Sequence, residues 1–143
     1  MKTRNASAKW KGTLKEGSGS IKLPYIGKEM AYSFSSRFED GEGTNPEELI
    51  AAAHSGCFSQ ALALALKEEG YEANKIETTC KISLDKKEGG FAIVKSELIT
   101  KVDVADIDDE EFQKIADDAK ENCPVSKALS SSVKITLDAT LHN

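Results

Sequence analysis

Two cysteines stand out in the amino-acid sequence, because each occupies a position at which a thiol could react. Cys57 lies in the middle of the most apolar segment, residues 49–66, and a second cysteine, Cys123, directly precedes Pro124. Proline prefers the first position of a helix, which places Cys123 at the N-cap, where unpaired amides and the helix dipole favour an anion. Two thiols far apart in sequence, each at a marked position, suggest a pair that meets in space and performs redox chemistry.

Three side chains are candidates for assisting Cys57. His54 lies one helical turn before it and could orient the thiol, act as a base or simply pack in the core, with packing as the default. Arg37 is expected on the polar face of the preceding strand, and a cation near the thiol would favour the reactive thiolate. Acidic residues in a first helical turn stabilise the helix electrostatically, which accounts for Glu48 and leaves Glu47 free for another role.

Less reactive interpretations of the same residues remain open. Free cysteine is among the most buried residue types, so Cys57 could pack as a small hydrophobe, and Cys80 is expected to do so on the apolar face of a strand. A zinc site is a further alternative, because His54 and Cys57 share one helical face and Cys123 could supply a third ligand. This spacing permits a metal site without specifying one, and the sequence has no Cys-x-x-Cys pair or glycine-rich phosphate loop. We therefore assign no metal and no cofactor.

The composition and charge are those of a soluble globular protein. The 143 residues, 39% of them hydrophobic and 30% charged, are the size of one domain with one core, which we expect to span residues 1–143. The net charge of −5, without a cluster of lysines and arginines, argues against a nucleic-acid surface. Three cysteines without a signal peptide indicate a reducing compartment, and hence the cytoplasm, in which a disulfide is transient.

The apolar segment is expected to be a buried helix and not a membrane span. A span needs about 20 strongly apolar residues, whereas residues 49–66 are interrupted by polar side chains and flanked by charge. The helix has a clear start, with Asn45 as N-cap, Pro46 at the first position and Glu48 placed to complete a capping box, and Gly70 ends it. Apolar residues occupy nearly every side of this helix, so a second layer or a partner chain is expected to cover what one sheet leaves open.

The remaining segments complete an α+β domain. Residues 7–38 are expected to form strands, since apolar and polar residues alternate there with a period of two. Further strands are expected at residues 76–84, at residues 91–104, where an imperfect alternation suggests a bulge, and at residues 133–141. Between the last two, Asp108 caps a helix whose inward side chains are Phe112, Ile115, Ala116 and Ala119. The order is three strands, a helix, two strands, a helix and a strand.

Four segments of the sequence carry motifs that belong together. They are Arg37-Phe38-Glu39, Gly43-Thr44-Asn45-Pro46-Glu47-Glu48-Leu49, Ala52-Ala53-His54-Ser55-Gly56-Cys57-Phe58-Ser59 and Asn122-Cys123-Pro124-Val125-Ser126. In these segments the chain resembles the OsmC/Ohr family of thiol-dependent peroxidases, and most closely its OsmC branch. The resemblance runs nearly from end to end and includes Ser83-Leu84-Asp85-Lys86 and Ile135-Thr136-Leu137-Asp138.

The resemblance implies an OsmC-like fold, in which a β-sheet packs with a long central apolar helix and two subunits form an intertwined homodimer. It implies an enzyme that reduces organic hydroperoxides and, less well, hydrogen peroxide. Members of the family are regenerated by dithiols, often lipoyl groups, so a hydroperoxide substrate and a dithiol reductant are the expected partners. Neither a nucleic acid nor a membrane is expected as a partner.

The resemblance also implies roles for individual residues. Cys57 matches the peroxidatic cysteine of the family, Cys123 its resolving cysteine and Glu47 its glutamate. Arg37 matches the arginine of the OsmC branch, whereas the Ohr branch carries its arginine nearer the N-terminus, where this chain has Gly17-Ser18-Gly19. The chemistry agrees with these roles, because arginine stabilises an attacking thiolate and a carboxylate holds that arginine through bidentate pairing. A second thiol protects the sulfenic acid product by condensing with it to a disulfide.

A protein without enzymatic activity is the alternative. It would be a thiol redox sensor, or a metal-binding protein that uses His54, Cys57 and Cys123. Turnover of a hydroperoxide with a dithiol distinguishes the enzyme from the sensor, and metal analysis of the purified protein distinguishes both from the metal binder.

Overall fold

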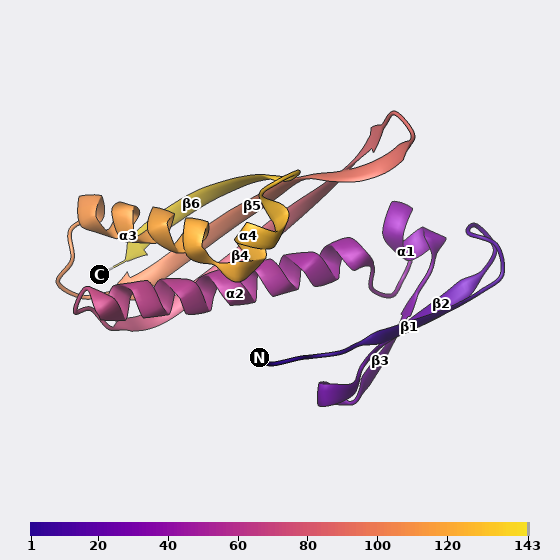
Figure 1. Ribbon diagram of the computed structural model, residues 1–143, viewed down its shortest axis with the longest axis horizontal. Helices are drawn as coiled ribbons and strands as arrows, with labels where there is room; N and C mark the ends of the chain where they lie inside the picture. The colour runs from indigo at the N-terminus through magenta and orange to yellow at the C-terminus, as the bar shows by residue number, and fades with distance from the viewer. Residues whose placement is uncertain (143) are drawn as a thin grey trace. The chain divides into compact units, whose positions relative to one another are not determined.

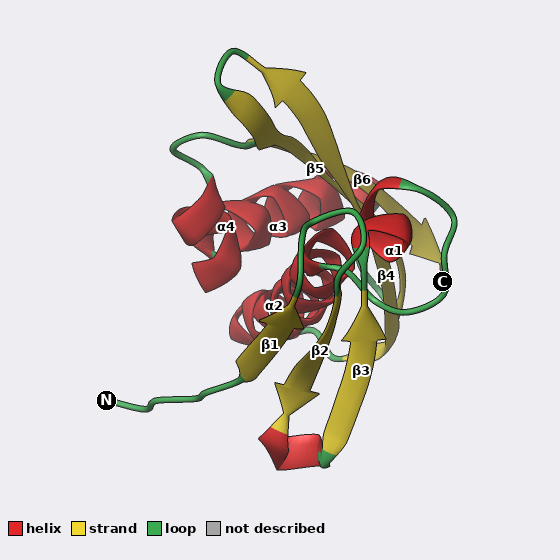
Figure 2. Cartoon of the chain, turned by 90° about the vertical axis from the view of Figure 1, so that its right-hand side faces the viewer, coloured by secondary structure: helices red, strands yellow, loops and turns green. Residues whose placement is uncertain are grey.

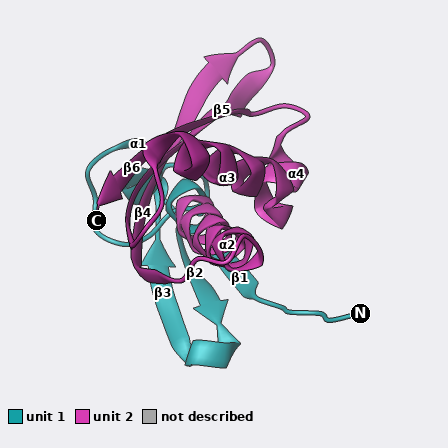
Figure 3. Ribbon diagram, turned by 90° about the vertical axis from the view of Figure 1, so that its left-hand side faces the viewer, with its two compact units in different colours: residues 1–49 teal, residues 50–143 magenta. Residues whose placement is uncertain are grey.

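The computed structural model describes residues 1–142, which form two compact units (Figure 3). The first unit is Met1–Leu49, and the second begins at Ile50 and runs to the end of the described chain. Each unit contains its own three-stranded sheet, and helices accompany both sheets. The predicted α+β class is confirmed.

The first unit is built on an antiparallel sheet in the order β1-β2-β3. Its elements are β1 (Ser7–Lys11), β2 (Ser18–Leu23), the 3-10 turn η1 (Pro24–Ile26) and β3 (Lys28–Tyr32). Gly27 closes the turn with a φ of 65°, a left-handed conformation that glycine adopts without steric cost. The strands predicted for this part of the chain are confirmed as far as β3.

The strand prediction is wrong for the residues that follow, because Phe34–Phe38 form a short helix, α1. The hydroxyl of Ser33 accepts a hydrogen bond from the backbone N–H of Ser36 at 3.0 Å, and the hydroxyl of Ser36 accepts one from the N–H of Ser33 at 2.9 Å. This reciprocal capping box starts a helix and competes with sheet pairing, so the extended chain ends at Ser33. Arg37 consequently lies in the last turn of a helix and not on a strand face.

Helix α2 (Pro46–Glu68) begins where the sequence predicts. The side chain of Asn45 accepts a hydrogen bond from the backbone N–H of Glu48 at 2.7 Å, which satisfies one of the unpaired amides of the first turn. The predicted capping box takes a different form, because the carboxylate of Glu48 accepts a hydrogen bond from the hydroxyl of Thr44 at 2.7 Å.

Helix α2 ends at the predicted glycine. The N–H of Tyr71 donates to the carbonyl of Leu66 at 2.9 Å, and the N–H of Gly70 donates to the carbonyl of Lys67 at 3.1 Å. These two bonds form a Schellman motif, which requires a left-handed residue, and Gly70 supplies it with a φ of 90°.

The second unit contains a mixed sheet in the order β4-β5-β6. Its strands are β4 (Ala73–Lys87), β5 (Gly90–Val104) and β6 (Lys134–His142). The antiparallel register of β4 and β5 shifts by one residue between the pairs Ser83–Lys95 and Leu84–Ile93, which confirms the predicted bulge. Strand β6 pairs with β5 in parallel, so the chain must cross over between them.

Two helices form this crossover, α3 (Asp109–Asn122) and α4 (Pro124–Leu129). Helix α3 begins at the predicted cap, since the carboxylate of Asp108 accepts a hydrogen bond from the backbone N–H of Glu111 at 2.9 Å. Its four predicted inward side chains are all buried: Phe112, Ile115, Ala116 and Ala119. Helices α2 and α3 cover the same face of the second sheet (Figures 1 and 2), and the core between them and the sheet is one apolar cluster.

The second unit buries only one stripe of α2. The buried residues of the helix recur at every fourth position: His54, Phe58, Leu62 and Leu66. Leu64, on another side, is 60% exposed. By length and composition, α2 is the one helix within residues 1–142 that could cross a membrane, a test that core helices of soluble proteins also pass. Within the described chain, the cover that the sequence predicts for the rest of α2 is therefore incomplete.

Candidate active site

The structure places Cys57 and Cys123 next to each other. Cys57 comes from α2, and Cys123 is the single residue between α3 and α4. The thiol of Cys123 donates a hydrogen bond to the sulfur of Cys57 across 3.1 Å. A disulfide has an S–S length of about 2.05 Å, so the two sulfurs need to approach by only about 1 Å to form one. Both cysteines are free thiols in the structure.

Cys123 occupies the junction that the sequence predicts. Its backbone N–H donates to the carbonyl of Ala119 at 2.9 Å and so closes α3, while the residue serves as N-cap of α4. Pro124 at the first position of α4 explains the break, because proline cannot continue α3 but suits the start of a new helix. The thiol is fully buried, which removes it from solvent and leaves Cys57 as its reaction partner.

The immediate surroundings of Cys57 favour the neutral thiol. Burial raises the pKa of Cys57, and the adjoining thiol of Cys123 raises it further. The backbone N–H of Val125 acts in the opposite direction by hydrogen bonding. The thiolate is the nucleophile, and a cation near Cys57 would act against this rise in pKa.

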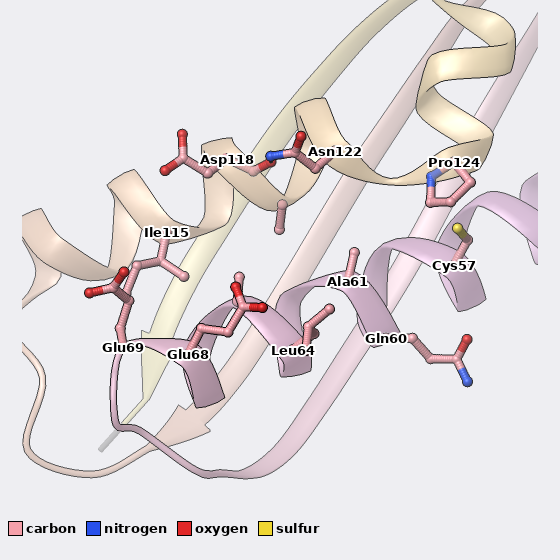
Figure 4. A pocket seen from close by; sticks show the side chains of 12 residues that line it. Cys57, Gln60, Ala61, Leu64, Glu68, Glu69, Ile115, Asp118, Asn122 and Pro124 are labelled. Atoms are coloured by element: carbon pink, nitrogen blue, oxygen red, sulfur yellow. The ribbon is translucent and has the colours of Figure 1, made fainter.

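A cavity of about 570 Å³ gives access to Cys57. It runs between α2 and α3, and Figure 4 shows Cys57 and Pro124 at one end and Glu68 and Glu69 at the other. Apolar side chains form part of its lining, among them Ala61, Leu64 and Ile115. A small organic molecule can therefore reach the thiol from this side.

Arg37 and Glu47 form a bidentate ion pair in the first unit. Arg37 Nη2 lies 2.7 Å from Glu47 Oε1, and Arg37 Nε lies 3.1 and 3.2 Å from the two carboxylate oxygens. The side chain of Glu47 is only 11% exposed and that of Arg37 34%. Glu47 comes from the first turn of α2 and Arg37 from α1, so the helix that replaces the predicted strand is what presents the guanidinium to the carboxylate.

Arg37 also borders an aromatic cavity of about 380 Å³ within the first unit. Its guanidinium carbon lies 5.2 Å from the centre of the Phe38 ring, within the range of a cation–π contact. The remaining aromatic side chains of the lining are Trp10, Tyr32 and Phe34. The charged guanidinium of Arg37, held by Glu47, thus lies beside aromatic side chains.

His54 bonds to two serines of the second unit. Its Nδ1 lies 2.6 Å from the hydroxyl of Ser96 on β5, and its Nε2 lies 2.8 Å from the hydroxyl of Ser126 in α4. The ring is fully buried, and this burial lowers the pKa of His54. Both ring nitrogens are occupied, and residues 1–142 contain no group of three or more histidine, cysteine or acidic side chains placed to hold a metal. The alternative of a metal site at His54, Cys57 and Cys123 is therefore not supported.

Cys80 lies on β4, as predicted, and packs against the core. Its sulfur lies 3.1 Å from the hydroxyl of Ser96 and 3.9 Å from Nδ1 of His54, and burial raises its pKa. The two serines that bond His54, Ser96 and Ser126, are not among the site residues predicted from the sequence. A signal was present for Ser96, because it precedes the alternating buried residues Leu98 and Val102 on β5, and a polar side chain on a buried face needs a partner.

The fold and the thiol pair together define a two-cysteine redox protein with an α+β fold. The sequence model of the family described as OsmC-like protein matches residues 39–138, and the chain belongs to this family. The chain is 45% identical to Peroxiredoxin OsmC of Escherichia coli over 139 residues, which is 96% of each chain. It is 37% identical to the organic hydroperoxide resistance protein OhrB of Bacillus subtilis over 101 residues, 70% of this chain and 72% of that one.

Solved structures agree with this membership. The crystal structure of OhrB from Bacillus subtilis superposes with a TM-score of 0.76 at 30% identity, and the match covers 95% of this chain and 98% of that one. An OsmC-like protein from Mycoplasma pneumoniae has the same TM-score of 0.76 at 17% identity, with 99% of both chains covered, which shows the fold alone. The resemblance identified from the sequence motifs and the OsmC-like fold are both confirmed.

The sulfur geometry leads to a testable prediction. Mild treatment with a hydroperoxide should join Cys57 to Cys123 and leave Cys80 reduced, because only the first two sulfurs are in contact and Cys80 is held in the core. Mass spectrometry of peptides from the non-reduced, alkylated protein identifies the linked pair. The Cys80→Ala variant is the control and should give the same disulfide, whereas a dominant disulfide that contains Cys80 would contradict the prediction.

Proposed function

We propose that this protein is a thiol-dependent peroxidase that reduces organic hydroperoxides and, less efficiently, hydrogen peroxide. The observation that carries the proposal is the contact of 3.1 Å between the sulfurs of Cys57 and Cys123 at the end of an open cavity. The relatives support the same chemistry, since one is named a peroxiredoxin and another an organic hydroperoxide resistance protein.

In the first step, Cys57 is the peroxidatic cysteine. Its thiolate attacks one oxygen of the hydroperoxide, the O–O bond breaks, and the second oxygen leaves as an alkoxide that takes up a proton to become an alcohol. The sulfur is oxidised by two electrons to a sulfenic acid, and the peroxide is reduced by the same two electrons. The half-buried position of Cys57 on the cavity suits this step, because a peroxide in the cavity can reach the thiol.

In the second step, Cys123 is the resolving cysteine. Its sulfur attacks the sulfenic sulfur of Cys57, an S–S bond forms, and the oxygen leaves as water. A dithiol reductant, such as a lipoyl group, then attacks the disulfide and returns both cysteines to thiols through a mixed disulfide. The short distance between the sulfurs favours rapid resolution, which protects Cys57 from oxidation to sulfinic acid.

Arg37 is the cation that offsets the raised pKa of Cys57, and Glu47 fixes its orientation. The guanidinium is held by the carboxylate through both Nε and Nη2, and Nη1 lies outside this pairing, where it could donate to a substrate or thiolate. Arginine stays charged at every accessible pH, so it favours the thiolate in the free enzyme and the departing oxygen during the reaction.

The active form is a homodimer, and we place the two halves of each site on different subunits. Glu47 and Cys57 both belong to α2 and are ten residues apart, which corresponds to about 15 Å along a helix axis. A glutamate side chain cannot span that distance, and in a helix it leans towards the N-terminus, away from Cys57. Two copies of α2 packed side by side about a two-fold axis would bring Glu47 of one to Cys57 of the other. Between Glu47 and Cys57, the small residues Ala52, Ala53 and Gly56 of α2 are exposed, and such packing would cover them.

We further propose that residues 1–143 act as a single OsmC-like domain in the cytoplasm. The family match at residues 39–138 crosses the boundary between the two units, which supports one functional domain. Asn143, the last residue of the proposed domain, lies outside the described residues. Three free cysteines suit a reducing compartment, and the net charge of −5 suits neither nucleic acid nor an anionic membrane as a partner.

The two thiols should be separable by mutation. Cys57→Ser should abolish the reduction of cumene hydroperoxide, because no nucleophile remains. Cys123→Ser should react once, then lose turnover with a dithiol and accumulate sulfinic and sulfonic acid at Cys57. Stopped-flow measurement of peroxide consumption gives the single turnover, and mass spectrometry gives the oxidation state. Wild-type turnover by Cys57→Ser would show that the nucleophile is assigned wrongly, and a single oxidation without dithiol-driven turnover in the wild type would favour the redox sensor.

Substitution of Arg37 should change the acidity of Cys57. In Arg37→Ala the pKa of Cys57 should rise, because the cation that stabilises the thiolate is lost. At a pH below the pKa, an increase of one in the pKa reduces the fraction of thiolate about tenfold. The rate of oxidation should fall accordingly, and its pH profile should shift to higher pH. Alkylation of Cys57 as a function of pH, followed by mass spectrometry, measures the pKa. Arg37→Lys is the control, because it keeps the charge but loses the bidentate geometry. An unchanged pKa of Cys57 in Arg37→Ala would show that Arg37 is a solvated surface residue with no effect on the thiol.

Mixed dimers test which subunit supplies Glu47. A Cys57→Ser chain combined with a Glu47→Gln chain retains one intact Cys57 and one intact Glu47 on opposite subunits. If each site is shared, such heterodimers should recover about half of the wild-type activity per dimer, since one of the two symmetric sites is complete. This comparison requires that Glu47→Gln alone is strongly impaired.

The matched control reverses the expectation. A wild-type chain paired with a chain that carries both substitutions has its intact Cys57 and Glu47 on the same subunit. Shared sites should leave this heterodimer nearly inactive, whereas sites built within one chain should make it the active one. Activity in the second heterodimer and none in the first would therefore refute the shared site.

A further inference from the structure

His54 is a fully buried titratable side chain for which the proposed reaction has no use. It cannot be dismissed as apolar packing, because each ring nitrogen has a short hydrogen bond, one to Ser96 and one to Ser126. A neutral imidazole donates through one nitrogen and accepts at the other, and the two hydroxyls satisfy both roles. The ring therefore joins strand β5 to helix α4 through the interior of the second unit.

The bond to Ser126 repeats the contact of the two thiols one turn further along. His54 precedes Cys57 by three residues in α2, and Ser126 follows Cys123 by three residues at the start of α4. Residues three apart lie on the same face of a helix, so His54 and Cys57 face the same neighbour. Helix α2 and the start of α4 thus meet at two points, His54 with Ser126 and Cys57 with Cys123. The two segments run in opposite directions, so the residue that comes first in one pairs with the residue that comes last in the other.

Helix α4 is short and contributes few side chains to the core. It has only six residues, too few for a helix to be stable by itself. Ser126 is its one buried residue, so its deepest side chain is polar and is satisfied by His54. Val125 contributes apolar contact at the edge of the core. The bond between His54 and Ser126 accordingly fixes both the rotation of α4 and its distance from α2.

We propose that His54 is a positioning residue, which holds α4 against α2 through Ser126 and thereby keeps the thiol of Cys123 on Cys57. The hydroxyl of Ser96 bonds to the other ring nitrogen and is not part of this contact. The inference rests on the proposed disulfide cycle for its biological meaning. His54 takes no part in the bonds that form and break; it sets the effective concentration of the Cys123 thiol at Cys57.

The effective concentration is measured at equilibrium, without peroxide. The protein is incubated with mixtures of glutathione and glutathione disulfide, in which Cys57 and Cys123 lose two electrons and two protons and glutathione disulfide becomes two glutathione thiols. Alkylation and mass spectrometry then give the fraction of the Cys57–Cys123 disulfide. Ser126→Ala should lower the equilibrium constant for this disulfide about tenfold, which raises its reduction potential by about 30 mV.

Ser96→Ala is the matched control. It removes the same kind of oxygen atom from the other side of the same ring, so both variants take a short hydrogen bond from the imidazole. In Ser96→Ala the sulfur of Cys80, 3.9 Å from Nδ1, loses its contact with Ser96 as well. Only Ser126→Ala releases α4. The potential of Ser96→Ala should therefore stay close to that of the wild type, and thermal unfolding should show similar melting temperatures for the two variants.

A second pair of variants decides the question if Ser126→Ala does not fold. In His54→Gln the side-chain amide can lie where Nε2 lies and can still bond to Ser126, whereas in His54→Asn it lies at the position of Nδ1, towards Ser96. Both lose the ring, but His54→Gln should keep a potential near the wild type and His54→Asn should show the rise. Equal potentials for Ser126→Ala and Ser96→Ala, or for His54→Gln and His54→Asn, would overturn the proposal.

The same samples distinguish this inference from the proposed function. If the wild type forms the disulfide in glutathione but does not turn over a hydroperoxide, the peroxidase assignment fails while the role of His54 stands. If the wild type turns over and Ser126→Ala keeps both its potential and its rate of disulfide formation, the role of His54 fails while the peroxidase stands.

Discussion

The parallel pairing of β5 with β6 is the constraint on which the arrangement of the thiols depends. Parallel neighbours cannot be joined by a tight turn, so the chain must leave the sheet after β5, cross one face and return. That crossover is α3 followed by α4, on the face that α2 already covers (Figure 1). The break between the two crossover helices falls at Cys123, directly over Cys57. The parallel pairing of β5 with β6 thus places Cys123 against Cys57, which lies 66 positions earlier in the chain.

The interior of the second unit combines an apolar cluster with a line of polar contacts, and both contribute to the site. Below α2, Ser59 bonds to Thr78 at 2.8 Å, Thr78 lies 2.9 Å from Thr100, and His54 bonds to Ser96 one turn earlier. Among residues 1–142, every buried side-chain nitrogen and oxygen has a hydrogen-bond partner. Such directional contacts fix the rotation of α2 on the sheet, which apolar packing alone specifies less strictly. Cys57 is therefore held at a defined angle.

Much of the fold was predictable because local rules decide it. The start of α2 at Asn45, its end at Gly70 and the cap of α3 at Asp108 each follow from the chemistry of one or two residues. The helix at Phe34–Phe38 was missed, because the alternation of apolar residues continues through it and the capping by Ser33 outweighs that pattern. The thiol contact could be suggested but not established, since it depends on how distant segments pack. The partners of His54 could not be named from the sequence for the same reason.

The bulge in β5 divides the second sheet into two parts of unequal strength. Strand β6 pairs with β5 only from Lys95 onwards, directly after the register shift, so the segment towards Gly90 is a two-stranded ribbon. A two-stranded hairpin is marginally stable in water, whereas the three-stranded part is backed by the core. Amide hydrogens should therefore exchange with solvent along a gradient, fast at the tip and slow next to the thiols.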